Sequence, residues 1–525
     1  MTPETSQHPR RPSLAAAVLG VVSAGLALGI TELVSGLGGE GKPTVITAVG
    51  SRFIDRFAGS LKDFAVSVFG TNDKPALIVG IVITTLLLGA VAGLVELRRS
   101  WGGAVVVAVF AVVGLLASFA DPLGSKALMT FAVLLASTVA AIALHVSVGR
   151  IRPSMLIDAS PERVPPQDMR IKTPDRRQFL RAAGLIGTAG AATAVAGRGL
   201  RSAVGAPSGD NVVLPAPVST TGTVVAGEPL TVAGISPYVT PTEDFYRIDT
   251  ALVVPRPDVS KWKLSFKGLV ENPYSITYDE ILAMDQVEVP VTISCVSNEV
   301  GGDLVGNATW SGVPLRLLLD RAGVRPEATQ IVGRSIDDFT AGFPTSALAD
   351  DRTALLAVGM NGAPLTADHG FPARLIIAGL YGYVSATKWL KEIELTTWEQ
   401  FDGYWIPRGW DKEGPVLTQS RIDVPANGIM KVGPNPIAGV AWAPTRGISK
   451  VEVSIDDGPW MEAKLGSVAS DETWVQWMYV WDAVQGDHRA RVRATDGDGV
   501  VQTSVEHRPG PNGATGYHSK KLLVS

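Results

Sequence analysis

The sequence is poor in the residues that build disulfides and redox centres. Only one of its 525 residues, Cys295, is a cysteine, and only six are histidines. A single thiol cannot form an internal disulfide, an iron–sulfur cluster or a cysteine-rich zinc site. The sequence also lacks a basic excess: 46 basic and 50 acidic residues give a formal net charge of −4, which argues against a nucleic-acid binder. Cys295 is therefore either a small buried apolar side chain or a thiolate that binds a metal or attacks a substrate.

Long apolar runs are confined to the part of the chain before residue 200. A stretch at 45–69 has helical periodicity with interspersed charges, which predicts an amphipathic helix at one membrane face. We expect residues 1–150 to form an all-α transmembrane bundle of four helices. The runs that are long and apolar enough to cross a bilayer are 14–35, 76–95, 103–120 and 127–148.

Basic residues flanking these runs indicate their orientation. Arginines precede the first run at positions 10 and 11 and follow the second at 98 and 99, and a basic cluster at 150–177 follows the fourth. By the positive-inside rule, the N-terminus and the loop near residue 150 should be cytoplasmic. His145 is the only histidine inside the runs, so a haem held by two histidines is not available within one chain. We expect neither haem nor an iron–sulfur cluster.

A fifth, weakly apolar segment follows in residues 151–200. The basic loop there leads into Arg176-Arg177-Gln178-Phe179-Leu180 and an Ala/Gly-rich stretch at 182–197, which resembles a twin-arginine translocation signal. An ordinary anchor with basic flanks is the alternative. Cleavage at 194–196 and retention as a fifth transmembrane helix both remain open. We expect a multi-pass protein of the cytoplasmic membrane whose following domains lie outside the cytoplasm.

The second half of the chain has the composition of a water-soluble protein. A Gly-, Ala-, Pro-, Val- and Thr-rich linker covers residues 201–236. Residues 237–425 mix strand-like runs with short helical patterns, which predicts an α+β domain. Residues 426–525 contain short alternating runs separated by Asp/Gly turns, which predicts an immunoglobulin-like β-sandwich.

Four groups of motifs occur in order around Cys295: residues 245–252, 295–302 with 310–315, 360–365 with 369–374, and 379–382 with 386–390. With the sandwich, they make residues 237–525 resemble the sulfite oxidase family of molybdopterin-dependent oxidoreductases. The resemblance implies a molybdenum–molybdopterin cofactor and an α+β domain of the sulfite oxidase type. Because residues 426–525 resemble the family's dimerisation domain, it also implies a possible homodimer.

The resemblance assigns roles residue by residue. Cys295 would be the thiolate bound to molybdenum, and Arg247 would lie beside the metal and the pterin as a second catalytic residue. His369 and Arg374 would hold the pterin phosphate, and Asn298 would donate a hydrogen bond behind the thiolate. The other implied cofactor contacts are Phe245, Tyr246, Ile248, Asp249, Ala386, Thr387 and Lys388.

Two departures from the family pattern bear on the substrate. Sulfite-oxidising members carry arginines shortly after the cysteine, whereas this chain has an acid, Glu299, and no arginine at 298–302. A carboxylate beside the metal would repel a dianion such as sulfite. Ile248 and Asp249 stand where sulfite oxidisers carry Asn and His. These differences leave room for the reduction of a neutral oxide, such as a sulfoxide or N-oxide, or for oxidation of another substrate.

We therefore predict oxygen-atom transfer with a small substrate, while the metal alternates between two oxidation states. Electrons would be exchanged with an external partner, either a cytochrome or a quinone-linked protein. One alternative is a sulfite oxidase proper. Another is a non-catalytic cell-envelope scaffold or interaction protein, which would bind no metal. In a third, the membrane half would itself serve as a quinone-linked electron conduit.

Overall fold

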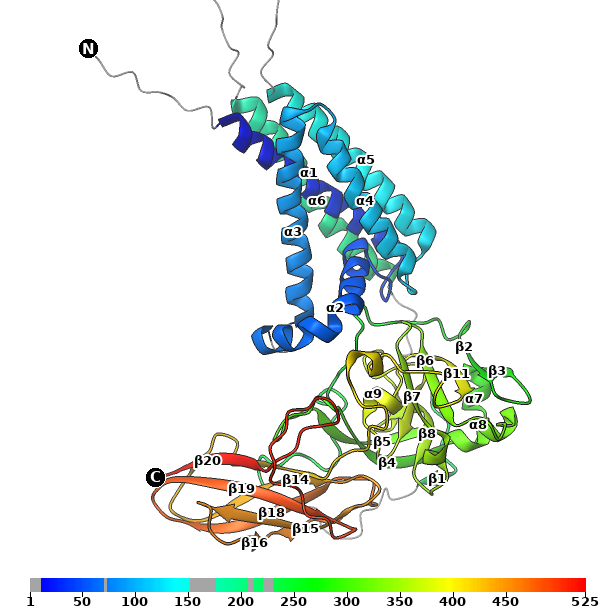
Figure 1. Ribbon diagram of the computed structural model, residues 1–525, viewed down its shortest axis with the longest axis vertical. Coiled ribbons are helices and arrows are strands. Elements are labelled where there is room, and N and C mark those ends of the chain that lie inside the picture. The colour runs from blue at the N-terminus through cyan, green and yellow to red at the C-terminus, as the bar shows by residue number, and fades with distance from the viewer. Residues whose placement is uncertain (1–10, 70–72, 152–175, 206–211, 221–229) are drawn as a thin grey trace, which may run out of the picture. The chain divides into compact units, whose positions relative to one another are not determined.

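The computed structural model describes residues 11–69, 73–151, 176–205, 212–220 and 230–525. By their contacts the described residues form two units, a helical one within 1–206 together with 250–256, and a strand-rich one within 207–249 and 257–525 (Figure 1). The predicted basic loop, with the start of the predicted signal, lies outside the described residues at 152–175, as do parts of the predicted linker.

The helical unit contains the helices that the apolar runs predict. It consists of α1 (Arg11–Gly36), α2 (Val45–Phe69), α3 (Asp73–Arg98), α4 (Gly102–Ala120), α5 (Lys126–Ile151) and α6 (Arg176–Val204). The four predicted runs lie within α1, α3, α4 and α5, the fifth lies within α6, and α2 has the bounds predicted for the amphipathic helix. Among the described residues, five helices, all but α2, could span a membrane, which is consistent with membrane association.

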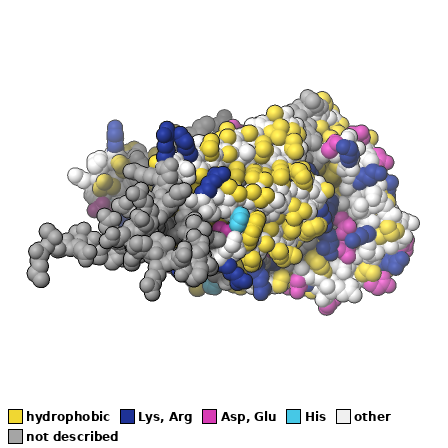
Figure 2. All heavy atoms as spheres, turned by 90° about the horizontal axis from the view of Figure 1, so that it is seen from above, with side chains coloured by type: hydrophobic (Ala, Val, Ile, Leu, Met, Phe, Trp, Pro, Cys, Tyr) yellow, Lys and Arg dark blue, Asp and Glu magenta, His cyan; other side chains and the backbone are white. Residues whose placement is uncertain are grey.

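Glycines let these helices pack closely. A Cβ atom added to Gly93 of α3 would lie 2.0 Å from the carbonyl oxygen of Ala16 in α1, and one added to Gly29 of α1 would lie 2.2 Å from that of Gly190 in α6. Such small-residue contacts are typical of helices that pack in a membrane. Elsewhere the unit carries exposed apolar side chains, and Figure 2 shows hydrophobic side chains gathered on the face seen from above.

Polar contacts inside the helical unit join separate segments. The buried carboxylate of Glu96 accepts hydrogen bonds from the N–H groups of Trp101 and Gly103, and pairs with His145 Nδ1 at 2.8 Å. These contacts fasten the α3–α4 turn to α5, so His145 has a structural partner. At the start of α3, Lys74 Nζ donates to the carbonyl oxygen of Ala251 at 2.8 Å, which explains why residues 250–256 belong to this unit.

Two sheets form the α+β part of the second unit. One has the strand order β1-β4-β5-β8-β10, with β9 beside β8, and the other has the order β3-β2-β11-β6-β7. Their strands are β1 (Ser219–Thr220), β2 (Lys263–Gly268), β3 (Tyr274–Thr277), β4 (Val287–Ser294), β5 (Val305–Pro314), β6 (Gln330–Ser335), β7 (Thr340–Pro344), β8 (Ala354–Met360), β9 (Ala363–Pro364), β10 (Arg374–Ile377) and β11 (Leu390–Thr396). The connecting helices are α7 (Tyr278–Leu282), α8 (Leu315–Ala322), α9 (Gly382–Ser385) and the 3₁₀ turns η3 (Thr345–Leu348) and η4 (Ile406–Arg408).

The C-terminal part is built from strands alone. Its sheets have the orders β12-β14-β18-β17 and β13-β20-β19-β15-β16. Alternating apolar residues from both sheets, among them Val453, Trp477, Val492 and Leu522, share one buried core, as the period of a half-buried strand requires. The strands are β12 (Gln419–Val424), β13 (Ile429–Met430), β14 (Gly433–Trp442), β15 (Ile448–Ile455), β16 (Met461–Glu462), β17 (Lys464–Leu465), β18 (Val475–Ala483), β19 (Gly486–Asp496) and β20 (His518–Val524).

The α+β part and the C-terminal part also share a core with each other. Trp442 and Trp474 are buried in the same apolar cluster as Trp310 of β5. The Trp474 indole donates to the carbonyl oxygen of Tyr238 at 2.8 Å. Strand β12, which precedes the predicted boundary at residue 425, pairs with β14 in the C-terminal sheet. The two parts are therefore joined by buried contacts as well as by the chain.

Candidate functional site

Cys295 begins the loop that closes the β4–β5 hairpin. Ser294 and Val305 are paired in the ladder, so residues 295–304 form the connection. The Cys295 N–H donates to the Leu304 carbonyl at 2.9 Å, and the Asn298 side-chain oxygen accepts from the Leu304 N–H at 2.9 Å. The loop is thus closed on itself, with Cys295 at its base. Asn298, which we expected to donate a hydrogen bond behind the thiolate, uses its oxygen to close the loop.

The thiol of Cys295 is buried. The residue is 8% exposed, and its Sγ accepts a long hydrogen bond from the Ser297 N–H at 3.4 Å. Burial, and then the nearby Cys295 thiolate, raise the pKa of Tyr246 well above its ordinary value. Burial and the same thiolate also raise the pKa of Tyr381 to about 12. Two neutral phenols therefore lie within electrostatic range of the sulfur, and each can donate a hydrogen bond.

Arg374, the first residue of β10, is a buried cation. It is 5% exposed, Nη1 donates to the His369 carbonyl at 3.2 Å, and the guanidinium lies 5.0 Å from the centre of the Trp310 ring. In the part of the chain that the structure describes, its Nε has no hydrogen-bond partner. Burial lowers the pKa of Arg374 to about 10. A buried guanidinium with an unused donor calls for an anion or a polar ring that accepts hydrogen bonds.

His369 lies on the turn before β10 and is neutral near pH 7. It is 6% exposed, and burial lowers its pKa. Its Nε2 donates to the Thr242 carbonyl at 2.9 Å, because a carbonyl oxygen can only accept. The ring stands edge-on to Phe245, with the ring centres 5.8 Å apart. In the neutral ring Nδ1 remains as an acceptor, and the imidazole is held between the turn and the 242–245 segment.

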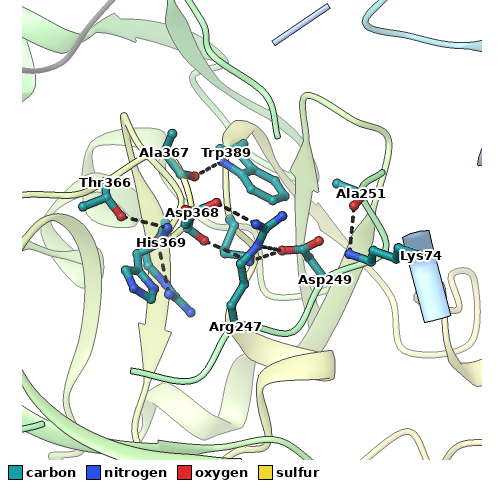
Figure 3. Close-up of polar contacts among 11 residues, drawn as sticks. Lys74, Arg247, Asp249, Ala251, Thr366, Ala367, Asp368, His369 and Trp389 are labelled. Carbon is teal, nitrogen blue, oxygen red and sulfur yellow. Dashed lines mark hydrogen bonds and ion pairs between the residues drawn. The ribbon is translucent and has the colours of Figure 1, made fainter. Parts of the chain in front are cut away.

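Lys388 belongs to a second cluster, whose members Arg247, Asp249 and Asp368 are labelled in Figure 3. Lys388 Nζ donates to Asp249 Oδ2 at 2.7 Å, and Arg247 bonds the same carboxylate at 2.9 Å and Asp368 at 2.7 Å. Burial lowers the pKa of Lys388 to about 8, although the charge of Asp249 opposes this. Burial would lower the pKa of Arg247 as well, but its bonds to Asp249 outweigh that effect and raise it. The positive charges of Lys388 and Arg247 are thus offset by the negative charges of Asp249 and Asp368.

The other predicted residues differ in their surroundings. Thr387 is fully buried, and its Oγ1 donates to the Gly333 carbonyl at 3.4 Å. Ala386 follows α9 and donates its N–H to Gly382. Ile248, between Arg247 and Asp249 in the chain, is 49% exposed. The structure adds two residues that the motifs did not single out, Tyr381 and Asp368, although both lie inside or next to them.

These side chains fit a molybdopterin cofactor. No group of three or more His, Cys, Asp or Glu side chains able to hold a metal occurs in the described ranges, so a metal bound by several protein ligands does not suit them. A soft thiolate at Cys295 suits a metal whose other ligands come from a dithiolene. The unsatisfied Nε of Arg374 suits a polar pterin or its phosphate.

Comparison with known proteins identifies the family. The model of the oxidoreductase molybdopterin binding domain matches residues 251–405. The uncharacterized oxidoreductase YuiH of Bacillus subtilis (strain 168) is 33% identical over 165 residues, which are 31% of this chain and 80% of that protein. The chain belongs to the sulfite oxidase family of molybdopterin oxidoreductases. It is a molybdenum-dependent enzyme with the α+β domain of that family.

Other members of the sulfite oxidase family are more distant. Sulfite oxidase of Arabidopsis thaliana is 26% identical over 286 residues, covering 45% of this chain and 72% of the relative. Among solved structures, the sulfane dehydrogenase SoxCD from Paracoccus pantotrophus matches with a TM-score of 0.49 and 22% identity, covering 55% of this chain and 82% of that one.

Proposed function

We propose that this chain is a membrane-anchored molybdopterin oxidoreductase that transfers an oxygen atom to or from a small uncharged substrate. The molybdenum would be bound by Cys295, outside the cytoplasmic membrane. The observation that carries the proposal is the buried cation of Arg374, whose Nε has no acceptor among the described residues. Tyr246 interacts electrostatically with both Arg374 and the buried Cys295, so the cation and the sulfur belong to one site.

The cofactor supplies the oxygen-atom transfer and the two-electron change that accompanies it. The chain supplies a ligand for the metal and the side chains that bind the pterin. Cys295 offers one thiolate, while Arg374 donates toward the polar edge of the pterin or its phosphate. Lys388, in the second cluster, can exchange its bond to Asp249 for a phosphate oxygen. Neutral His369 packs against Phe245 and fixes the turn that presents Arg374.

The charges around the site favour an uncharged substrate over sulfite. Asp249 and Asp368 neutralise Arg247 and Lys388, so these cations offer little attraction to a free dianion. Reduction of a sulfoxide or N-oxide consumes two electrons and two protons and yields the deoxygenated product and water. The phenols of Tyr246 and Tyr381 are neutral hydrogen-bond donors that suit the polarised oxygen of such a substrate.

Membrane attachment follows from the five apolar helices, and the sidedness we propose follows from the flanking basic residues and the twin-arginine-like motif. Electrons would come from an external cytochrome or quinone-linked partner. We also propose that the C-terminal strands form an immunoglobulin-like sandwich through which two copies associate. Light scattering of the purified protein tests this last point, and a monomeric mass would rule it out.

One preparation tests the enzyme and its direction together. Full-length protein is purified in detergent from cells with an intact molybdopterin pathway, and metal, pterin and turnover are measured. We expect molybdenum and pterin, and oxidation of reduced methyl viologen by dimethyl sulfoxide or trimethylamine N-oxide. Faster turnover of sulfite with ferricyanide would instead identify a sulfite oxidase proper. Folded protein without metal or pterin would favour the scaffold alternative.

A further inference from the structure

The tip of the Cys295 loop is held by the C-terminal strands. Arg421 of β12 donates from Nη1 to the Gly302 carbonyl at 2.8 Å. A Cβ atom added to Gly301 would lie 2.4 Å from Cδ2 of His518 in β20, so the ring rests directly on this glycine. Gly301 also has a φ of +79°, which other residues rarely adopt. The tip is therefore confined from one side by a hydrogen bond and from another by a ring.

Both residues that confine the tip are themselves fixed. Arg421 is 11% exposed in its side chain, and it also bonds Asp423 at 2.7 Å and Ser236 at 2.8 Å. His518 Nδ1 accepts from the Ile422 N–H at 2.9 Å. Burial lowers the pKa of His518 to about 4, so the ring stays neutral and keeps this bond near pH 7. We call the contacts of Arg421 and His518 with the loop the brace.

The C-terminal part also holds the strand that leads into Cys295. The Thr292 N–H donates to the Glu472 carbonyl at 3.0 Å, and the Thr292 hydroxyl accepts from the Trp474 N–H at 2.8 Å. Thr292 lies three residues before Cys295 in β4, and Gly301 lies six residues after it in the loop. Contacts from residues far away in sequence thus fix the chain on both sides of the thiol.

We propose that Arg421 and His518 are positioning residues for the thiolate of Cys295. This inference rests on the proposed role of Cys295 as the metal ligand. A loop with two glycines at its tip would otherwise sample many conformations, because glycine restricts the backbone least. A metal ligand has to be held within a fraction of an ångström of its working position. By tying the tip to β12 and β20, one strand from each C-terminal sheet, the brace keeps the sulfur in one orientation.

The solitary thiol gives a direct, metal-free assay. In cofactor-free, full-length protein, alkylation by iodoacetamide can only report Cys295, and its rate follows how often the loop opens. Loss of a charge-assisted hydrogen bond corresponds to roughly tenfold more opening, so Arg421→Met should react about tenfold faster. His518→Ala should react faster too, and Arg421→Lys should recover part of the protection. Arg489→Met, which removes an exposed ion pair of the same domain, is the control and should react like wild type.

Because Arg421→Met leaves Asp423 without this partner, a charge-balanced variant is needed. The double variant Arg421→Met with Asp423→Asn keeps the local net charge while removing the bond to Gly302, and it should also react faster. In enzyme loaded with cofactor, these variants should change the electron paramagnetic resonance spectrum of the partly reduced metal. They should lower kcat with dimethyl sulfoxide while KM stays near its wild-type value.

Two results would overturn the proposal. In one, alkylation is as slow in Arg421→Met, His518→Ala and the charge-balanced variant as in wild type. In the other, alkylation is faster but the spectrum and kcat of loaded enzyme are unchanged, which would make the brace purely structural. Failure of the proposed function has a different signature. Wild-type protein would then lack molybdenum, leaving no metal to position, while alkylation would still report whether the loop is held.

Discussion

Replacing Arg374 with methionine should stabilise the cofactor-free protein and abolish cofactor retention. The reason is that Arg374 is charged, 5% exposed and has no acidic partner among the described residues. Its pKa falls from 12.5 to about 10 on burial, and each pKa unit corresponds to about 1.4 kcal/mol. Folding with this charge therefore costs roughly 3 kcal/mol at pH 7 in the absence of an anion.

Part of that gain is offset, because methionine loses the hydrogen bond to His369 and the contact with the Trp310 ring. The hydrogen bond from the charged guanidinium contributes roughly 1.5 kcal/mol and the ring contact roughly 0.5–1 kcal/mol, which leaves a net stabilisation of about 1 kcal/mol. For a domain of this size, the midpoint of thermal unfolding should rise by roughly 2–4 °C. Fluorescence of full-length, cofactor-free protein can follow the transition, since Trp310 lies under the substituted side chain.

Arg316→Met is the matched control. Arg316 also donates to a single backbone carbonyl, that of Leu348, but it is exposed, so it carries no burial cost. We expect its loss to change the midpoint little in either direction and to leave molybdenum content unaffected. A midpoint for Arg374→Met several degrees below wild type, with molybdenum retained, would refute the reasoning. Arg374 would then be a structural cation with an unrecognised partner.

Three further predictions follow from the same structure. Cys295→Ser should abolish turnover and leave the circular dichroism spectrum nearly unchanged; wild-type turnover would remove the ligand assignment. Burial lowers the pKa of Lys388 from 10.5 to about 8, so the unfolded chain binds that proton more tightly between these pH values. Stability of cofactor-free protein should therefore rise with pH in this window, and Lys388→Met should lack that part of the rise; identical pH profiles would contradict the assignment. Gly93→Val should destabilise the helices in detergent by circular dichroism, whereas Gly80→Val, which has open space around it, should not; equal effects would argue against close α1–α3 packing.

Local patterns were enough to place most elements of the fold. Hydropathy placed the five apolar helices because a bilayer demands long, uninterrupted apolar runs. Helix α8 coincides with a short helical pattern in the sequence, and its buried residues repeat every three to four positions, whereas β10 coincides with a short apolar run whose residues are all buried. The membership of residues 250–256 in the helical unit was not predictable, because it depends on contacts such as that of Lys74 with Ala251.

The site was predictable only as a set of residues. Motif order singled out Cys295, Arg374 and Lys388, but motifs carry no information on which charges meet. The pairing of Lys388 with Asp249 joins positions 139 residues apart, and the bond from Arg421 to Gly302 spans 119. Such contacts depend on how the sheets pack. The sequence alone suggests a pocket of positive charge, but the packing brings Asp249 and Asp368 against Arg247 and Lys388. Arg374 is then the site cation that no described carboxylate neutralises.

The central claim is that this chain binds molybdenum through Cys295. Elemental analysis of full-length protein, produced with an intact molybdopterin pathway and compared with Cys295→Ser under identical conditions, tests it most directly. The account predicts stoichiometric molybdenum and pterin in wild type, with loss of metal or an altered metal spectrum in the variant. Well-folded wild-type protein containing neither metal nor pterin, or a variant indistinguishable from wild type, would contradict it.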